Sequence, residues 1–83
     1  MKVSVKYFAS IREAIGQSGE SLQTEVSTLA ALRDELIAKG GAYTESLARG
    51  RSVRLALNQI MCDESAVLFE GAEVAFFPPV TGG

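Results

Sequence analysis

The sequence predicts a single α+β domain in which a mixed sheet of about five strands carries one main helix on one face. Short segments near both ends of the chain alternate apolar and polar residues, which is the period of a half-buried strand, whereas residues 29–37 carry leucines at helical spacing. In addition, 83 residues with 47% apolar and 22% charged side chains suit one compact core rather than a disordered chain.

The first expected element is a strand at residues 2–8, KVSVKYF, which is predicted to place these apolar side chains on one face: Val3, Val5 and Tyr7. The next segment, SIREAIG, opens with a capping-box pattern, in which Ser10 is followed three residues later by Glu13, and it ends with Gly16. We therefore expect one or two helical turns after the first strand.

A returning strand and the main helix are expected next. Residues 20–26, ESLQTEV, alternate again through Leu22, Thr24 and Val26, so they can pair with the first strand as an antiparallel hairpin. Thr28 is a favourable N-cap, and the residues that then recur at helical spacing are Leu29, Leu32, Leu36 and Ile37. The glycines at 40–41 end this pattern.

The second half of the chain is expected to contribute three strands. Residues 40–52 form a polar, glycine-containing connector with room for another helical turn, and residues 53–62 predict a hairpin with a two-residue turn at Asn58 and Gln59. A further turn around Gly71 leads into the last strand, residues 73–77. This order of elements suits the β-grasp (ubiquitin-like) fold, in which the first and last strands lie side by side and parallel at the sheet centre.

Strand parity predicts that some large apolar side chains face away from the helix. If the first strand buries Val3, Val5 and Tyr7, the last buries Val74 and Phe76, and the hairpin buries Leu55, Leu57, Ile60 and Cys62, then three side chains point outward: Phe8, Met61 and Phe77. An exposed apolar patch of this kind indicates a protein partner. The alternative is that a kinked strand end or a bulge reverses the parity and returns one or two of them to the core.

Composition argues against several classes of function. A net charge of -2 with both signs interspersed disfavours binding to nucleic acid, and no apolar run reaches the roughly 20 residues of a membrane span. The absence of histidine disfavours a metal site and catalysis by the chain's own side chains. A single cysteine and no recognisable leader lead us to expect a cytoplasmic protein.

The end of the sequence, FFPPVTGG, suggests a β-grasp domain at 1–79 followed by a flexible tail at 80–83. Pro78 and Pro79 stop the last strand and direct the chain outward, and glycines without a Cβ fit a narrow channel. A terminal carboxylate is a poor electrophile until ATP converts it to an acyl adenylate; a sulfur donor then yields a thiocarboxylate, and an amine yields an isopeptide bond. Taken alone, such a diglycine tail is more often an ordinary frayed terminus than a functional one.

The segment EGAEVAFFPPVTGG closely resembles the C-terminal signature of the small, sulfur-carrier subunits of molybdopterin synthase, the MoaD family. The likeness spans the chain: VKYFASIREAIG resembles the family's first strand and helix, TLAALRDEL its main helix, and LALNQIM its hairpin. The main departures are Glu70 and Ala72, where the family usually has aspartates.

This resemblance implies a carrier that is not itself an enzyme and binds no cofactor. Gly83 would be adenylated by a ubiquitin-activating-like adenylyltransferase that uses ATP, and then converted to a thiocarboxylate by a sulfur donor protein. Val80, Thr81 and Gly82 would thread into the large catalytic subunit, where sulfur passes to cyclic pyranopterin monophosphate; two large and two small subunits would form a heterotetramer. The family's partner-facing residues fall on Phe8, Met61 and Phe77.

Several other interpretations accompany the main one. Arg12, expected near the exit of the tail, is a candidate for a salt bridge with a partner. The cluster of Arg49, Arg51 and Arg54 could meet acidic residues on a partner, but a solvated surface is the favoured interpretation. Cys62 is read as a small core residue rather than a persulfide relay. The alternatives to a molybdopterin carrier are a thiamin-type sulfur carrier and a ubiquitin-like protein modifier.

Overall fold

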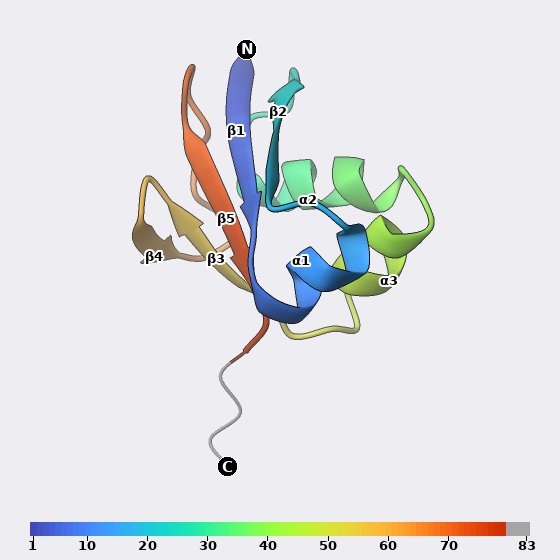
Figure 1. Cartoon of the computed structure of the whole chain (residues 1–83). Coiled ribbons are helices and arrows are strands. Elements are labelled where there is room, and N and C mark those ends of the chain that lie inside the picture. The colour runs from blue at the N-terminus through green and yellow to red at the C-terminus, as the bar shows by residue number, and fades with distance from the viewer. Residues whose placement is uncertain (80–83) are drawn as a thin grey trace.

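A computed structural model of the chain describes residues 1–79 (Figure 1). Its elements, in chain order, are β1 (Lys2–Tyr7), α1 (Ala9–Ile15), β2 (Gly19–Gln23), α2 (Leu29–Ile37), α3 (Ala42–Leu47), β3 (Arg54–Leu57), β4 (Ile60–Cys62) and β5 (Glu73–Phe77). The strands form one sheet in the order β2-β1-β5-β3-β4, in which β1 and β5 pair in parallel and the other pairs are antiparallel. The predicted β-grasp fold with parallel central strands is confirmed. The tail residues 80–83 lie outside the described residues.

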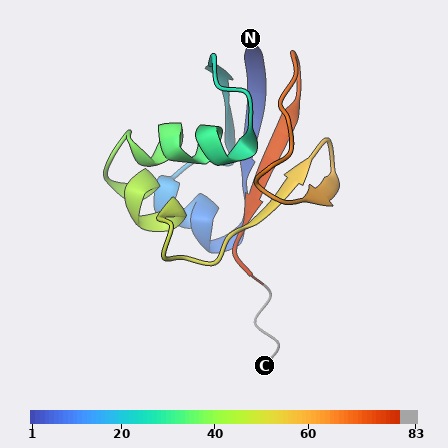
Figure 2. The same cartoon turned by 180° about the vertical axis from the view of Figure 1, so that it is seen from behind.

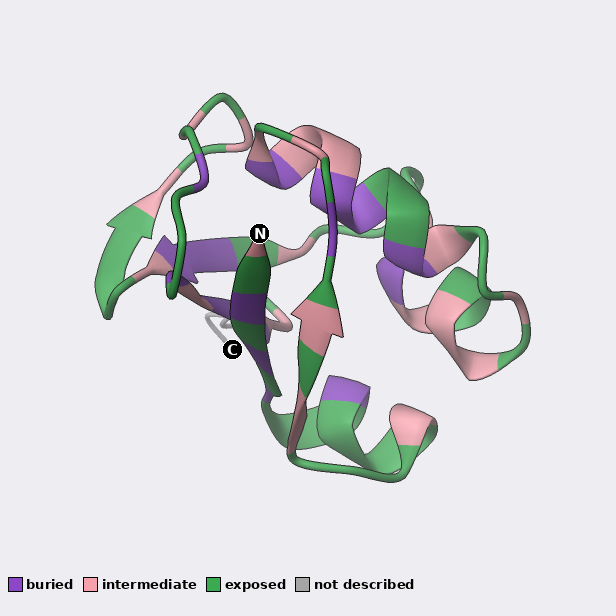
Figure 3. Cartoon of the chain, turned by 90° about the horizontal axis from the view of Figure 1, so that it is seen from above, coloured by how far each residue is buried: buried purple, intermediate pink, exposed green. Residues whose placement is uncertain are grey.

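The core lies between the sheet and α2, which crosses in front of the strands in the view from behind (Figure 2). The predicted inward residues of β1, namely Val3, Val5 and Tyr7, are each 1% exposed, and buried and exposed positions alternate along this strand (Figure 3). The inward residues of β5, Val74 and Phe76, are fully buried. Leucines of α2 complete the core: Leu29, Leu32 and Leu36.

The first helix begins earlier than the sequence indicates. The predicted capping box at Ser10 and Glu13 is wrong: α1 starts at Ala9, its N-cap is Phe8, and no side chain caps it. The chain turns directly off β1 through Ala9, which has a φ of 50°. The C-terminal end matches the prediction, because Gly16 adopts a φ of 88° and donates its N–H to the carbonyl of Arg12 at 2.8 Å.

The middle of the chain follows the prediction with one change. The Thr28 hydroxyl accepts a hydrogen bond from the N–H of Ala31 at 3.2 Å, so the predicted N-cap is confirmed. The 40–52 connector holds a short helix, α3, as the sequence allowed, and α2 is the longest of the three helices among the described residues. The second strand ends at Gln23, and Thr24 beyond it is buried, with its hydroxyl donating to Glu35 at 3.1 Å.

The hairpin forms as predicted, but one of its residues is not where parity alone placed it. Asn58 and Gln59 make the two-residue turn with φ values of 48° and 69°. Ile60, predicted to be buried, is 71% exposed. It has the inward parity, because it pairs with Leu57, but β4 is the outermost strand and lies at the sheet edge farthest from α1 and α3 (Figure 1).

Candidate partner-docking surface and tail base

The parallel pairing of β1 and β5 brings the C-terminal ends of the first and last strands together. Tyr7 lies beside Phe76 in the register, and the N–H of Phe8 donates to the carbonyl of Phe76 at 3.2 Å. Both strands therefore finish at the same end of the sheet, and Pro78 and Pro79 follow directly on β5. Anything attached after Pro79 starts from this junction.

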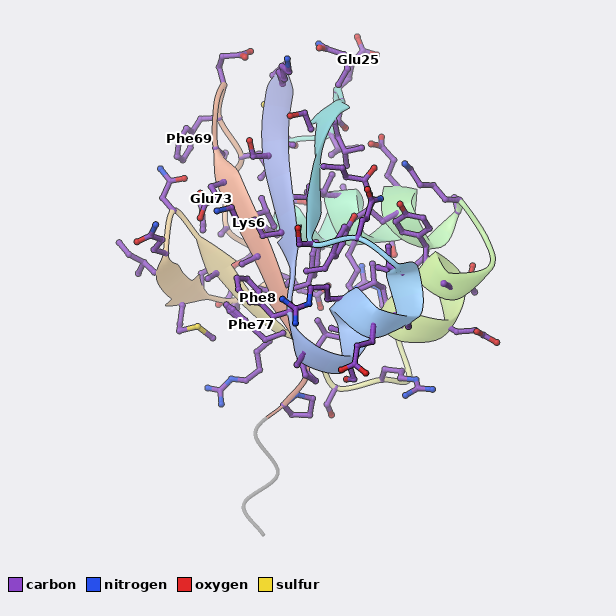
Figure 4. All side chains as sticks on the ribbon, viewed as in Figure 1. Lys6, Phe8, Glu25, Phe69, Glu73 and Phe77 are labelled. Atoms are coloured by element: carbon purple, nitrogen blue, oxygen red, sulfur yellow. The ribbon has the colours of Figure 1, made fainter. Side chains whose placement is uncertain are left out.

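Two phenylalanines lie together at this junction, on the sheet face that α2 does not cover (Figure 4). The rings of Phe8 and Phe77 pack edge to face, with centroids 4.8 Å apart and planes at 81°. Phe8 is 41% exposed and Phe77 is half-buried. The register of β1 with β5 runs unbroken from Ser4 to Tyr7, so no bulge reverses the predicted parity.

Met61 extends this apolar surface across the sheet. Ala56 lies opposite Met61 on one side and opposite Ala75 on the other, so the three residues form one row over β4, β3 and β5. Ala75 and Ala56 are only 6% and 2% exposed, although both have outward parity and no helix covers them. We call Phe8, Ala56, Met61, Ala75 and Phe77 the apolar face; its short alanines lie between larger flanking side chains, and Met61 is 51% exposed.

An ion pair borders the apolar face on the side away from the tail. The Nζ of Lys6 lies 3.7 Å from a carboxylate oxygen of Glu73, and both residues point to the same side of the sheet (Figure 4). Such a solvent-exposed pair adds at most about 1 kcal/mol to stability. The two charged side chains bound the apolar face, which therefore ends midway along β1 and β5.

The base of the tail lies against an open cavity of about 510 Å³. Pro78 and Pro79 line it together with residues of α1, of α3 and of the segment that precedes β3: Ser10, Ile11, Ala14, Glu45, Ser46, Arg51, Ser52 and Val53. Pro78 is half-buried here and Pro79 is exposed. Because proline fixes φ near -65°, the two residues leave the sheet in a restricted direction.

A hydrogen-bonded carboxylate supports β1 from within, and no sequence pattern indicated it. The hydroxyls of Tyr7 and Tyr43 each donate to the same oxygen of Glu20 at 2.7 Å. Burial alone would raise the pKa of Glu20, but the hydrogen bonds from Tyr43 and Tyr7 outweigh it and lower this pKa. The Tyr7 ring stacks on Phe76 with centroids 6.2 Å apart, so the network holds the residue that precedes Phe77.

The remaining predicted residues have different outcomes. Arg12 is exposed on α1 and shares a surface pocket with Phe8. Cys62 is half-buried against the core, and this burial raises the pKa of its thiol, as expected for a small core residue. The predicted sulfur-carrying group, Gly83, and the predicted channel residues Val80, Thr81 and Gly82 lie outside the described residues.

The described residues also bear on two other kinds of site, a metal centre and a membrane span. Within residues 1–79, no group of three or more histidine, cysteine, aspartate or glutamate residues is arranged to hold a metal ion. No helix in the same part of the chain has both the length and the apolar character needed to cross a membrane.

The chain is similar to known proteins over nearly all its length. The sequence profile of the ThiS family matches residues 5–83. The molybdopterin synthase sulfur carrier subunit of Haemophilus influenzae is 37% identical over 81 residues, which cover 98% of this chain and 99% of that relative.

Solved structures show the same fold. SAMP1 from Haloferax volcanii has a TM-score of 0.79 at 22% identity and covers 100% of both chains. A chain from the protein-protein complex of subunits 1 and 2 of the molybdopterin-converting factor of Helicobacter pylori has a TM-score of 0.71 at 26% identity, again over 100% of both chains.

Proposed function

The chain belongs to the ThiS family, and from this premise we propose that it is the sulfur carrier subunit of a molybdopterin synthase, acting in molybdenum cofactor biosynthesis. The full-length similarity to a curated carrier of that name supports this assignment over the other carriers of the same fold. As a carrier, it is the non-catalytic subunit, and the chemistry of sulfur transfer belongs to its partners.

The proposed reacting group is the carboxyl group of Gly83, taken as the C-terminal carboxyl group of the chain. An adenylyltransferase joins it to the AMP moiety of ATP and releases pyrophosphate, because a free carboxylate is too poor an electrophile to react. A hydrosulfide ion delivered by the sulfur donor then attacks the acyl carbon, AMP leaves, and a thiocarboxylate results. In the large subunit this sulfur passes to cyclic pyranopterin monophosphate, and two such transfers supply the dithiolene.

The described residues contribute by placing the tail. The observation that carries the proposal is the position of Phe8 and Phe77, which form a partly exposed aromatic pair at the point where β5 is followed by Pro78. A partner that covers the apolar face is thereby aligned with the start of the tail. Fixing that start lowers the entropic cost of bringing Gly83 to a distant active centre.

The proposed partner for the apolar face is the large catalytic subunit, in a heterotetramer of two small and two large subunits. The complex of subunits 1 and 2 from Helicobacter pylori contains a chain of the same fold, which supports this choice. We assign Phe8, Met61 and Phe77 to the contact and residues 80–82 to the channel of the partner.

Intact-mass measurement tests the proposal. The chain is coexpressed with the adenylyltransferase and a sulfur donor, and we expect the exchange of one carboxyl oxygen for one sulfur. Two control variants, one that lacks Gly83 and one with a single residue appended after it, should fold normally and keep their original mass. An unmodified wild-type chain under conditions that modify a known carrier would refute the assignment.

Binding to the large subunit distinguishes a molybdopterin carrier from the two alternatives, a thiamin-type sulfur carrier and a ubiquitin-like protein modifier. A thiamin-type carrier would acquire the thiocarboxylate but would not bind the large synthase subunit or support pterin conversion. A protein modifier would be recovered with Gly83 in isopeptide linkage to lysine. The assay for the proposed function is therefore conversion of the pterin precursor by the thiocarboxylated chain and a purified large subunit.

A further inference from the structure

Half of the lysine and arginine side chains of this chain have no carboxylate partner among residues 1–79. The chain has eight lysines and arginines. Four of them form ion pairs: Lys6 with Glu73, Arg33 with Glu64, Lys39 with Glu20, and Arg49 with Asp34 and Glu64. The side-chain nitrogens of the other four, Lys2, Arg12, Arg51 and Arg54, have no carboxylate oxygen within 4.0 Å in the described part of the chain.

Three of these four cations surround the base of the tail. Arg54 lies opposite Phe77 in the register of β3 with β5. Arg51 lines the same cavity as Pro78 and Pro79. Arg12 lines a pocket with Phe8, whose ring packs on Phe77. We call Arg12, Arg51 and Arg54 the arginine collar.

The fourth cation, Lys2, lies at the opposite end of the sheet. It begins β1, which runs parallel to β5, whereas the collar lies where both strands end. The strand between Lys2 and Phe8 spans roughly 20 Å at about 3.3 Å per residue. Among residues 1–79, three of the four lysine and arginine side chains without an ion pair thus lie near Pro78 and Pro79.

The collar contrasts with the charge of the chain as a whole, which is -2. Glu45 lines the cavity with Arg51, and Glu13 follows Arg12, but neither carboxylate forms an ion pair with a collar residue. The sequence predicted that Arg49, Arg51 and Arg54 form one solvated cluster, but the structure gives Arg49 different contacts from the other two. Arg49 bonds to Asp34, Glu64 and the carbonyl of Ala30, whereas the side chains of the other two remain available.

We propose that the arginine collar binds carboxylate side chains at the mouth of the channel through which the large synthase subunit receives the tail; this inference rests on the proposed function. The collar continues the apolar face, because Arg54 adjoins Phe77 and Arg12 adjoins Phe8. A guanidinium also matches a carboxylate in planar, two-point hydrogen bonding, which a lysine cannot do. The apolar face then supplies the buried contact, and the collar supplies a charged rim around the entering tail.

The position of the collar favours a protein carboxylate over a substrate phosphate. Four residues separate Pro79 from the proposed reacting carboxyl group, and four extended residues span up to about 14 Å. A phosphate bound beside the reacting carbon of a tail held in a channel is therefore beyond the reach of a guanidinium at its base. Carboxylates at the channel mouth are within that reach.

The test compares a triple variant, Arg12→Gln, Arg51→Gln and Arg54→Gln, with the single variant Lys2→Gln, which removes a similarly unpaired charge at the far end of the sheet. Association with the purified large subunit is followed by surface plasmon resonance at about 0.05 M and about 1 M salt. At low salt we expect the triple variant to lose about tenfold or more in affinity, mostly through slower association, and each single collar variant to lose about two- to threefold. The difference from wild type should largely disappear at high salt, and Lys2→Gln should stay within about twofold of wild type.

Thermal unfolding verifies that the collar variants fold, as expected for exposed residues without ion pairs. Wild-type affinity of the triple variant, or an equal loss for Lys2→Gln, would overturn the inference. A triple variant that binds the large subunit as tightly as wild type but no longer binds the adenylyltransferase would also overturn it. The variant Phe77→Asp, which places a charge in the apolar face, is measured alongside. If the wild-type chain binds the large subunit and Phe77→Asp weakens this binding, the proposed function stands even when the collar inference fails. Failure of the wild-type chain to bind the large subunit would overturn both.

Discussion

Phe8 and Phe77 come from opposite ends of the chain and pack ring against ring, with centroids 4.8 Å apart. The contact exists because β1 and β5 are parallel neighbours that end together. It places an exposed aromatic pair beside the prolines that begin the tail. Substitutions on the outer side of this junction should therefore affect binding to the proposed partner, whereas substitutions on its inner side should affect the stability of the core.

Met61 and Ile60 provide a matched pair for the apolar face. They are adjacent in β4, are 51% and 71% exposed, and have opposite strand parity. We expect Met61→Asp to weaken binding to the large subunit by more than tenfold, because a charge is then desolvated in an apolar contact. Ile60→Asp should leave the affinity within about twofold. Isothermal titration calorimetry measures both, and a larger loss for Ile60→Asp would place the contact on the other side of the hairpin.

Phe76 and Phe77 are expected to differ in how much each contributes to the stability of the fold. Phe76 is fully buried and stacks on Tyr7, so Phe76→Ala should lower the free energy of unfolding by about 3–5 kcal/mol. Phe77 is half-buried, and Phe77→Ala should cost about 1 kcal/mol while weakening the complex. Urea denaturation measures the first effect. Equal destabilisation by the two substitutions would show that Phe77 belongs to the core.

Glu20 is expected to make the free energy of unfolding depend on pH in the acidic range. Hydrogen bonds from Tyr43 and Tyr7 outweigh the opposing effect of burial, so the pKa of Glu20 is lower in the folded chain than the ordinary value of 4.5. Its contribution is therefore fully present above pH 4.5 and is lost as the pH falls through the lower, folded pKa. We expect Glu20→Gln to be less stable than wild type near neutral pH and to approach it in acid. Chemical denaturation across this range checks the sign, and a constant difference at all pH values would contradict it.

Gln59 is expected to limit the stability of the β3–β4 hairpin. It has a φ of 69°, a conformation that costs an L-residue about 1–2 kcal/mol. Glycine removes this strain, but its greater loss of backbone entropy on folding offsets about half of the gain. Gln59→Gly should therefore raise the free energy of unfolding by about 0.5–1 kcal/mol. Asn58→Gly, at a φ of 48°, serves as the control and should change less, because asparagine tolerates this region. Thermal unfolding of both variants tests the ranking, and destabilisation by Gln59→Gly would contradict it.

Local patterns were sufficient for most of the fold. Alternation identified the buried residues of β1 and β5, Thr28 identified the start of α2, and the Asn58–Gln59 turn identified the hairpin. These predictions succeed because each depends on neighbours in the chain: the side-chain period of a strand, one capping hydrogen bond and one turn geometry. The start of α1 was wrong because the chain leaves β1 through Ala9, and no sequence pattern specifies that path.

The sequence alone determined that Phe8, Met61 and Phe77 occupy outward positions, because parity is a property of each strand by itself. The tertiary structure decided which apolar positions are covered. Ile60 has inward parity yet is exposed on an edge strand, and Ala75 has outward parity yet is buried between neighbours. It also decided that Arg49 is ion-paired while Arg12, Arg51 and Arg54 surround the base of the tail, because such neighbours come from separate elements and meet only when the sheet is assembled.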